Sequence, residues 1–411
     1  MSVLIGFGPL PFGKLVRVSI APAVTSRTVT SSSTRLAWLD ALRGIGAIAV
    51  LAEHMLPWVI PSLRPYWFNI GLYGILVFFL VSGYIIPASL ERHGDVRAFW
   101  ISRVFRLYPI YLVTIGLVLA LAWWIPVRGA VPREPSTVVA HATMLLDVIG
   151  VGGVVDTMWT LSYEMVFYLL VTALFVGRVH RRSGVLALLF GLTALATALV
   201  LPGAPLTGGW LAWASGAAFA VGLTCVIADR LRTAAACGLG LMALILLLLS
   251  SRVPWFGVVI IAVMFTGTAI YRWEHGAGPF WPVIVTVVLV ALTPVWAIQG
   301  GWWWIQPDVW ITTIALAGTT FAGAMALRHR RVPRFLTWLG LISYSLYLLH
   351  HPLLKFYVAL TGDLRWSPLA VQVLMATLFV GLILPLSWVT YRFVERPMQR
   401  AGHRLARRLA G

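Results

Sequence analysis

Charged residues are scarce in this chain: they make up 11% of its 411 residues, whereas 60% are hydrophobic. An ordinary soluble domain carries about 25% charged residues. The composition therefore excludes a soluble globular protein of this length. It is typical of a helical membrane protein with many spans.

Cysteine is almost absent, with Cys225 and Cys237 the two in the sequence. Two residues cannot build a framework of several disulfides, and their spacing matches no metal site. We interpret both as small apolar residues, and we expect no bound metal.

Acidic residues are also few, with 13 against 31 basic ones and a net charge of +18. Such a charge can indicate nucleic-acid binding, but here the basic residues lie in short loops between apolar runs, where they set membrane orientation. We therefore expect membrane lipids and no nucleic acid as partners. Residues 1–35 contain no acidic residue and no uninterrupted apolar run before a small-residue cleavage site. They predict a disordered basic tail, or a start codon assigned too early, and not a signal peptide.

The apolar runs predict an all-α, polytopic transmembrane bundle of 10–12 spans, with twelve as the best count. The four runs from 234 to 327 are the weakest, so ten spans would also fit. We expect a membrane domain over 36–397 and a basic cytoplasmic tail over 398–411. The twelve segments are 38–60, 70–90, 104–126, 159–177, 184–202, 209–228, 234–251, 254–271, 281–298, 309–327, 336–357 and 367–391.

The distribution of lysine and arginine predicts the orientation. If both termini are cytoplasmic and the spans alternate, most of the 31 basic residues lie inside. An excess of this kind marks the cytoplasmic side of a plasma-membrane (inner-membrane) multi-pass protein, and it requires an even number of spans. The basic residues expected outside are Arg64, Arg128, Arg133, Arg252, Lys355 and Arg365.

The first predicted span contains four ionisable residues, Asp40, Arg43, Glu53 and His54. Ionisable groups inside a membrane usually mark function. Arg43 and His54 are 11 residues apart in the sequence; that places them on one helix face, about 16 Å apart along the axis. The alternative is that Arg43 reaches lipid headgroups and His54 is a packing residue.

Two later spans place further ionisable groups at a comparable predicted depth. Glu164 lies five residues inside the outer edge of its span, and His350, followed by His351, lies in the outer half of another. With His54 they could form a catalytic relay in which a carboxylate or second imidazole orients a general base. A purely structural hydrogen-bond network between helices is the alternative.

Arg103 and Arg106 lie on one helix face near the predicted cytoplasmic interface. Their guanidinium groups suit phosphates, either of lipid headgroups or of a nucleotide cofactor. In the second span, Ser82 and Gly83 lie near the predicted midplane. These small residues indicate either close helix packing or a substrate channel.

Together these segments resemble the acyltransferase-3 family of integral membrane O-acyltransferases, from about Leu36 to Pro397. Each motif alone is weak, but six in order are specific. The segments that carry the resemblance are LDALRG with Arg43 and His54, FFLVSGYII, RVFRLYP, WTLSYEMVFY, LGLISYSLYLLHHPLL and YRFVERP.

The resemblance implies transfer of an acyl group from cytoplasmic acyl-CoA, as a co-substrate and not a tightly bound cofactor, to a hydroxyl. It implies that Arg43 and His54 are the family's arginine–histidine pair, and that Glu164 and His350 belong to its later motifs. Arg103 and Arg106 match its basic motif, and Tyr344 its "SY…H" motif. The chain departs from the family at Glu53 and His351, which add ionisable groups beside the expected site.

We therefore expect a membrane O-acyltransferase with His54 as general base and Glu164 and His350 as further catalytic residues. We assign acyl-CoA binding to Arg43, Arg103 and Arg106, and substrate contacts to Ser82, Tyr344 and Glu53. The expected acceptor is a carbohydrate-containing molecule: a surface polysaccharide, a glycolipid or a macrolide-type metabolite. A secondary transporter is the alternative, although no motif recurs between the two halves.

Overall fold

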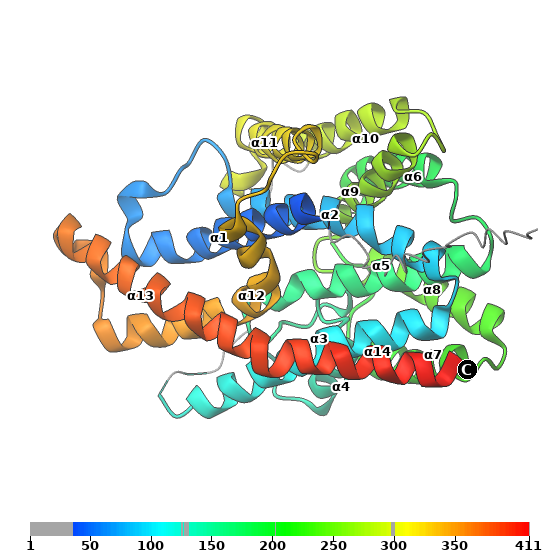
Figure 1. The fold of residues 1–411 in the computed structure, drawn as a ribbon, viewed down its shortest axis with the longest axis horizontal. Coiled ribbons are helices and arrows are strands. Elements are labelled where there is room, and N and C mark those ends of the chain that lie inside the picture. The colour runs from blue at the N-terminus through cyan, green and yellow to red at the C-terminus, as the bar shows by residue number, and fades with distance from the viewer. Residues whose placement is uncertain (1–35, 125, 127–130, 202, 297–300, 411) are drawn as a thin grey trace, which may run out of the picture. The chain divides into compact units, whose positions relative to one another are not determined.

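A computed structural model describes residues 36–124, 126, 131–201, 203–296 and 301–410. The tail predicted over 1–35 lies outside the described residues. Within the described part, all regular secondary structure is helical and no β-strand is present (Figure 1). The all-α expectation is therefore confirmed for this part of the chain.

Fourteen α-helices occur in the described residues. Their bounds are α1 (Ala37–Val59), α2 (Ile70–His93), α3 (Val96–Leu121), α4 (Pro135–Thr143), α5 (Trp159–Val176), α6 (Ser183–Val200), α7 (Trp210–Ile227), α8 (Arg232–Leu249), α9 (Pro254–Glu274), α10 (Trp281–Leu292), α11 (Pro307–Ala326), α12 (Arg334–Thr361), α13 (Leu369–Thr390) and α14 (Arg396–Ala410).

Each of the twelve predicted spans overlaps one helix, although α3 begins eight residues earlier than predicted and α10 ends at Leu292. Nine helices of the described chain are long and apolar enough to cross a membrane. Of the other three, α10 has 12 residues, and α1 and α12 contain the ionisable residues discussed above. The nine are α2, α3, α5 with the turn before it, α6, α7, α8, α9, α11 and α13 with α14.

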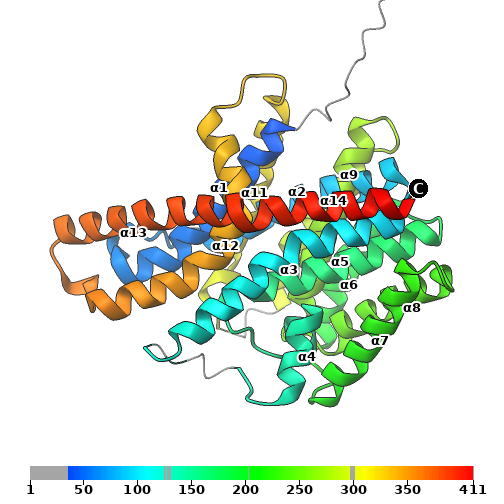
Figure 2. The same ribbon diagram turned by 60° about the horizontal axis from the view of Figure 1, so that its bottom comes forward.

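Helix α1 packs closely against α12 (Figure 2). A Cβ added at Gly340 would lie 1.9 Å from the carbonyl oxygen of Asp40, so only glycine permits this approach. Further along, His54 meets His350. Because residue numbers rise together on the two helices, α1 and α12 run parallel, and their functional residues share one level.

Helices α2 and α9 approach each other just as closely, since a Cβ at Gly83 would lie 1.8 Å from the carbonyl oxygen of Met264. The packing interpretation of this glycine is therefore correct. In contrast, α3 and α14 run antiparallel, because a Cβ at Gly402 would touch Phe105 and Arg97 donates to the carbonyl of Leu409. These directions agree with spans that alternate along the chain.

The segment 398–411, expected as a tail, belongs largely to helix α14. A π-helical turn, Tyr391–Glu395, joins α13 to α14. Such turns are frequent at functional sites. Here the turn carries the buried Glu395, whose carboxylate accepts hydrogen bonds from Ser345 of α12 at 3.0 Å and from Gln399 at 3.0 Å.

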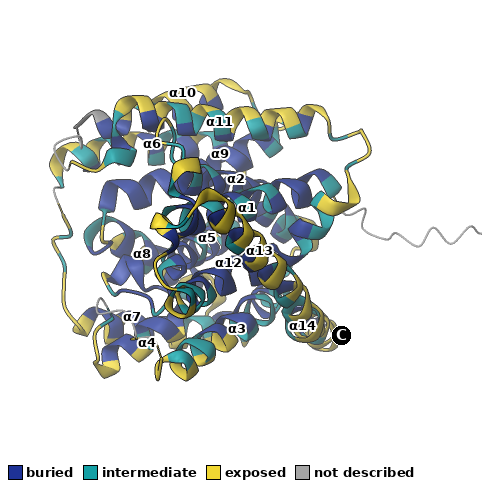
Figure 3. Ribbon diagram, turned by 90° about the vertical axis from the view of Figure 1, so that its left-hand side faces the viewer, coloured by how far each residue is buried: buried dark blue, intermediate teal, exposed yellow. Residues whose placement is uncertain are grey.

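Burial follows the pattern of a membrane bundle (Figure 3). Helix α9 is buried on every side from Pro254 to Ile270. The outward faces of α6, α10 and α13 expose large apolar residues, among them Leu189, Val288 and Leu378. Exposed apolar faces of this extent need a partner, and a lipid bilayer supplies one.

Candidate functional site

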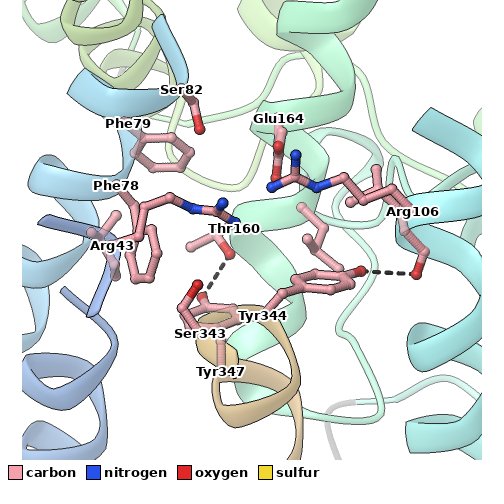
Figure 4. Close-up of a pocket in the computed structure, with 13 residues that line it drawn as sticks. Arg43, Phe78, Phe79, Ser82, Arg106, Thr160, Glu164, Ser343, Tyr344 and Tyr347 are labelled. Carbon is pink, nitrogen blue, oxygen red and sulfur yellow. Dashed lines mark hydrogen bonds between the residues drawn. The ribbon is translucent and has the colours of Figure 1, made fainter. Parts of the chain in front are cut away.

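A pocket with about 600 Å³ of empty space opens between α1, α2, α3, α5 and α12. Arg43 and Arg106 reach into it from α1 and α3, and Glu164 comes from α5 (Figure 4). The phenyl rings of Phe78 and Phe79 form the apolar part of its wall. The pocket therefore combines two guanidinium groups, one carboxylate and an apolar surface.

Glu164 lies on the arginine side of the bundle. Its carboxylate accepts a short hydrogen bond from the hydroxyl of Tyr168, and Figure 4 shows it pointing toward the Arg106 guanidinium. Glu164 and Arg43 also interact electrostatically. Glu395, from the π-helical turn, is a second carboxylate within electrostatic range of both arginines. The two acids balance the two arginines of the pocket.

Arg103 does not line this pocket, although it is only one turn from Arg106. It is 8% exposed, its guanidinium carbon lies 5.1 Å from the ring centre of Phe99 and 5.4 Å from that of Tyr168, and its Nε has no hydrogen-bond partner. Arg103 lines a second cavity of about 620 Å³, which is open to the outside, between α2, α3 and α14. His93, His403 and Arg407 also line this cavity.

The histidines gather at the other end of α1. Nδ1 of His54 lies 2.9 Å from the carbonyl oxygen of Val50 and 3.2 Å from Nε2 of His350. Nδ1 of His350 in turn lies 2.9 Å from the carbonyl oxygen of Leu346. A carbonyl can only accept, so both rings carry their proton on Nδ1. Nε2 of His54 is left with a lone pair.

Asp156 and His351 complete the cluster around His54. The His351 ring centre lies 4.9 Å from that of His54. Asp156 is in the 3₁₀ turn Asp156–Met158, directly before α5, and acts electrostatically on His54. Eight residues separate Asp156 from Glu164 in the sequence, about 12 Å along the helix axis. The acid beside the histidines is therefore Asp156.

This corrects the expectation that Glu164 shares the level of His54 and His350. That expectation measured depth from the end of each apolar run. The run of α5 begins at Trp159, but the chain enters the bundle one 3₁₀ turn earlier, at Asp156. The structure brings His54 and His350 together and places Glu164 with Arg43 and Arg106.

Tyr347 stands between the pocket and the histidines. It lines the pocket, and its ring centre lies 6.1 Å from that of His350. Its hydroxyl donates to the carbonyl oxygen of Thr157 at 2.8 Å and lies 2.6 Å from Oγ1 of Thr160. Neither His54 nor His350 is among the described residues that line the pocket. Tyr347 therefore closes the pocket on the histidine side.

The residues predicted to contact the substrate do not all lie in the same place. Ser82 and Tyr344 line the arginine pocket, where the Tyr344 hydroxyl donates to the carbonyl oxygen of Leu107 at 2.9 Å. Glu53 lies elsewhere. One of its oxygens accepts from Arg64 at 2.7 Å and the other from the N–H of Gly71 at 3.3 Å. These bonds tie α1 to the start of α2.

Two buried groups fix the loop before Asp156. Nε2 of His141, on α4, accepts from the N–H of Val154 at 3.2 Å, and burial lowers the pKa of His141 below its ordinary value. The carboxylate of Asp147 accepts from the Tyr163 hydroxyl at 2.6 Å, and burial raises its pKa. Burial thus shifts the pKa of each group in the direction of its neutral form, as expected for a loop packed against the bundle.

Sequence reasoning missed Asp156, Tyr347 and Glu395 as parts of the site. A spacing signal for two of them exists. Asp156, in the 3₁₀ turn before α5, is followed at every fourth residue by Thr160 and Glu164, which is the repeat of one helix face. Tyr347 lies three residues before His350 on α12, a spacing that also brings two side chains to one face. No local pattern points to His403 or Arg407, because α14 meets α3 only in the folded chain.

Known proteins resemble the chain over most of its length. A family model described as an acyltransferase domain, Acyl_transf_3, matches residues 36–392. The O-acetyltransferase OatA of Staphylococcus aureus is 21% identical over 386 residues, which cover 89% of this chain and 57% of that protein. The peptidoglycan O-acetyltransferase OatA of Listeria monocytogenes is 27% identical over 201 residues, which cover 43% of this chain and 31% of that protein.

The aligned part thus spans less than two thirds of the length of each relative. No solved structure matches the chain. The family match covers both the arginine pocket and the histidine cluster, and it extends over most of the described helices. The chain therefore belongs to the acyltransferase-3 family of membrane O-acyltransferases.

Proposed function

We propose that this protein transfers an acetyl or other short acyl group from acyl-CoA to a hydroxyl of a carbohydrate-containing acceptor. The observation that carries the proposal is the arrangement along α1. Arg43 lies in the pocket and His54 in the histidine cluster, on one face of the same helix, about 16 Å apart along its axis. A donor with a charged end and a long flexible arm fits that separation.

The second cavity supports a phosphate-bearing donor. His93, Arg103, His403 and Arg407 line it, and His403 is within electrostatic range of the other three. Asp95 is the one acidic residue among its described lining, and Asp95 already accepts from the N–H of Ala98. The two guanidinium groups, of Arg103 and Arg407, gain stability from an anion. The phosphates of acyl-CoA would supply that charge, with Arg103 in this cavity and Arg106 in the pocket.

The reaction we propose is a direct transfer. The acceptor hydroxyl oxygen attacks the thioester carbonyl carbon, while the hydroxyl proton passes to the lone pair on Nε2 of His54. The carbon–sulfur bond then breaks, and the CoA thiolate takes up the proton from the imidazolium. Nε2 of His350 accepts the hydrogen bond from Nδ1 of His54 and so holds the His54 ring in place. This transfer between the acceptor hydroxyl, the thioester and His54 needs no tightly bound cofactor.

The position of Glu164 supports a different role from the one expected for it. It lies with the arginines, so it would hold the Arg106 guanidinium in place for the donor. A donor in the pocket reaches His54 only if the Tyr347 side chain turns aside, because Tyr347 closes that end. Ser82 and Tyr344 would contact the donor arm, since both line the pocket.

We also propose twelve spans in a plasma membrane, with the arginine end in the cytoplasm. The parallel run of α1 and α12 agrees with ten spans or twelve, because the two are then both odd-numbered. Acyl-CoA would enter from the cytoplasm, and the histidine end would face outward. The names of the two relatives support O-acetylation, and one of them supports a peptidoglycan-like glycan as acceptor.

The test is donor-dependent transfer by the purified protein in lipid nanodiscs. Radiolabelled acetyl-CoA and soluble glycan fragments are supplied, and labelled glycan and free CoA thiol are measured. We expect labelled product from the wild type and none from His54→Ala. His275→Ala is the matched control, because His275 is exposed, directly follows α9 and has its Nδ1 2.8 Å from the carbonyl oxygen of Tyr271. A transporter would release no thiol, and that outcome would contradict the proposal.

A further inference from the structure

The histidine end contains three groups that can bind a metal ion. His54 of α1, Asp156 of the 3₁₀ turn and His351 of α12 each offer one ligand atom, and these atoms lie within 4.8 Å of one another. It is the one such group in the part of the chain that the structure describes. No sequence spacing indicates it, because the three residues come from separate elements.

The surroundings of His54 suit a metal ligand. A metal-bound histidine almost always donates its other ring N–H to a carbonyl or carboxylate, which fixes the tautomer and the ring orientation. Nδ1 of His54 is within 2.9 Å of the Val50 carbonyl and 3.2 Å of the acceptor nitrogen of His350. Nε2 of His54 is therefore the nitrogen left to face a ligand.

Two imidazoles and one carboxylate form a donor set that Zn²⁺ accepts. With Zn–N bonds of about 2.0–2.1 Å, atoms bound to one Zn²⁺ lie roughly 3.4 Å apart. The three ligand atoms of this cluster lie up to 4.8 Å apart, which is farther than in a metal-bound site. Rotation of the side chains can bring them closer. His54 and Asp156 are half-buried, so an ion can reach them from solvent, and three protein ligands leave a fourth position open.

Charged residues around the cluster would both attract and repel a bound cation. Asp156 and Glu53 are negative, although Glu53 is already paired with Arg64 at 2.7 Å. Lys355 follows His351 by one helical turn and acts on His54 as a positive charge. A cation bound at the cluster would be attracted by Asp156 and repelled by Lys355. Lys355 thus weakens the site without being one of its ligands.

We propose that His54, Asp156 and His351 bind a divalent transition-metal ion such as Zn²⁺, and that the bound ion blocks proton acceptance by His54. The claim that a metal ion binds is argued from the geometry alone. The claim that it inhibits transfer rests on the proposed function, because it follows only if His54 is the base. The metal takes the same Nε2 lone pair that the transfer step uses, so metal and proton compete for one site.

Binding is tested first and without any measurement of activity. Metal-free protein in nanodiscs, purified through a tag that contains no histidine, is titrated with Co²⁺ and followed by visible absorption; Zn²⁺ then displaces the Co²⁺. We expect one ion per chain and a weakening of at least tenfold in His351→Gln and in Asp156→Asn. Lys355→Met should tighten binding, and His275→Gln is the matched control.

If a ligand variant folds poorly, the tighter binding expected for Lys355→Met still tests the site, because Lys355 is not a ligand. Elution on size exclusion reports folding for every variant. Absence of a bound ion in the wild type would overturn the proposal. So would unchanged affinity in folded His351→Gln together with folded Asp156→Asn, since the ion would then lie elsewhere.

Inhibition is tested second, on the same samples. Release of CoA is measured with and without Zn²⁺ and expressed as a fraction of each variant's own metal-free rate. We expect Zn²⁺ to inhibit the wild type and to inhibit His351→Gln only at a concentration at least ten times higher. If one ion binds and transfer continues at the full rate, the competition with His54 is wrong while the metal site stands. If no variant transfers at all, the proposed function fails and the binding result is unaffected.

Discussion

Nδ1 of His54 lies 3.2 Å from Nε2 of His350, across the interface of two parallel helices. The carbonyl of Leu346 fixes the proton of His350 on Nδ1, so its Nε2 can only accept. The contact with Nε2 of His350, together with the Val50 carbonyl, holds the proton of His54 on Nδ1. One imidazole therefore helps to set the tautomer of the other, and the lone pair of His54 is on Nε2.

This relationship predicts different losses for the two histidines. His54→Ala should lower transfer by about 10²- to 10⁴-fold, which is the usual worth of a general base. His350→Gln should lower it less, because the amide can still accept from Nδ1 of His54. Acetyl transfer by nanodisc-embedded variants measures both. Equal losses in two folded variants would contradict the assignment of His350 as a positioning residue.

The two neighbouring arginines should also differ, because they face different cavities. Arg106→Ala should weaken acyl-CoA binding and also slow turnover, since Arg106 shares the pocket with Glu164. Arg103→Ala and Arg407→Ala should mainly raise the KM for acyl-CoA. A charge-assisted contact contributes roughly 1.5–3 kcal/mol, about 10- to 150-fold in affinity. Competition by free CoA measures this effect.

Arg330→Ala is a matched control for these arginines, because Arg330 is exposed and lines neither of the two cavities. A loss of turnover in Arg103→Ala with unchanged competition by CoA would mean that Arg103 holds the packing of Phe99 and Tyr168. The donor would then not use the second cavity.

Tyr347 gives a third prediction, because it separates the pocket from the histidines. Tyr347→Ala should admit water to the histidine end and raise acyl-CoA hydrolysis without acceptor, relative to transfer. Tyr347→Phe retains the ring but loses the bonds to Thr157 and Thr160, and it should show a smaller change. Free CoA thiol and acylated acceptor are measured together. An unchanged ratio in folded Tyr347→Ala would show that this ring does not control access.

Much of the fold could be predicted from the sequence. Apolar runs identified the twelve helices because a segment that crosses lipid must satisfy its own backbone hydrogen bonds. The pairing of Arg43 with His54 followed from helical periodicity, and the structure places one at each end of α1. The ends of the spans were less certain. An error of one turn in α5 was enough to place Glu164 beside the wrong partners.

Other features depended on contacts between distant segments. The meeting of His54 with His350 requires the close approach of α1 and α12 at Gly340, which no local pattern encodes. Tail residues His403 and Arg407 line a cavity only because α14 packs on α3. Asp156 lay before the predicted span 159–177, so only its spacing from Thr160 and Glu164 could have indicated its place in the site.

The fourth prediction concerns the loop before Asp156. The pKa of His141 in the folded chain is below the ordinary value of about 6.5, so the fold favours the neutral imidazole. Its stabilising effect should be present near pH 7.5. It should be lost progressively as the pH falls below about 6.5 toward the folded-state pKa, because the unfolded chain binds the proton first. Hydrogen exchange of residues 144–158 at pH 7.5 and 5.5 measures this effect.

His141→Gln provides the comparison, since its amide can accept from the Val154 N–H but does not titrate in this range. Protection is the intrinsic exchange rate at each pH divided by the measured rate. The loss of protection on acidification should be smaller in this variant than in the wild type. His275→Gln should retain the response of the wild type. The same response in all three proteins would assign the pH dependence to another group.

The fifth prediction is that transfer crosses the membrane. Arg43, Arg106 and the second cavity lie at one end of the helices, and the histidine cluster lies at the other. We propose that the excess of arginine at the first end orients that end toward the cytoplasm. A cytoplasmic acceptor would have to pass the arginine pocket and Tyr347 to reach His54.

Sealed proteoliposomes of known orientation test the fifth prediction, because neither acyl-CoA nor a soluble glycan crosses lipid unaided. Acyl-CoA is placed at the arginine face, and the acceptor is supplied to one face at a time. We expect product when the acceptor is at the histidine face and almost none when both substrates share the arginine face. Permeabilised vesicles control for total activity. Product formed only when both substrates share the arginine face would mean that the acceptor and the donor enter by the same opening, and that His54 receives its proton from the cytoplasmic side.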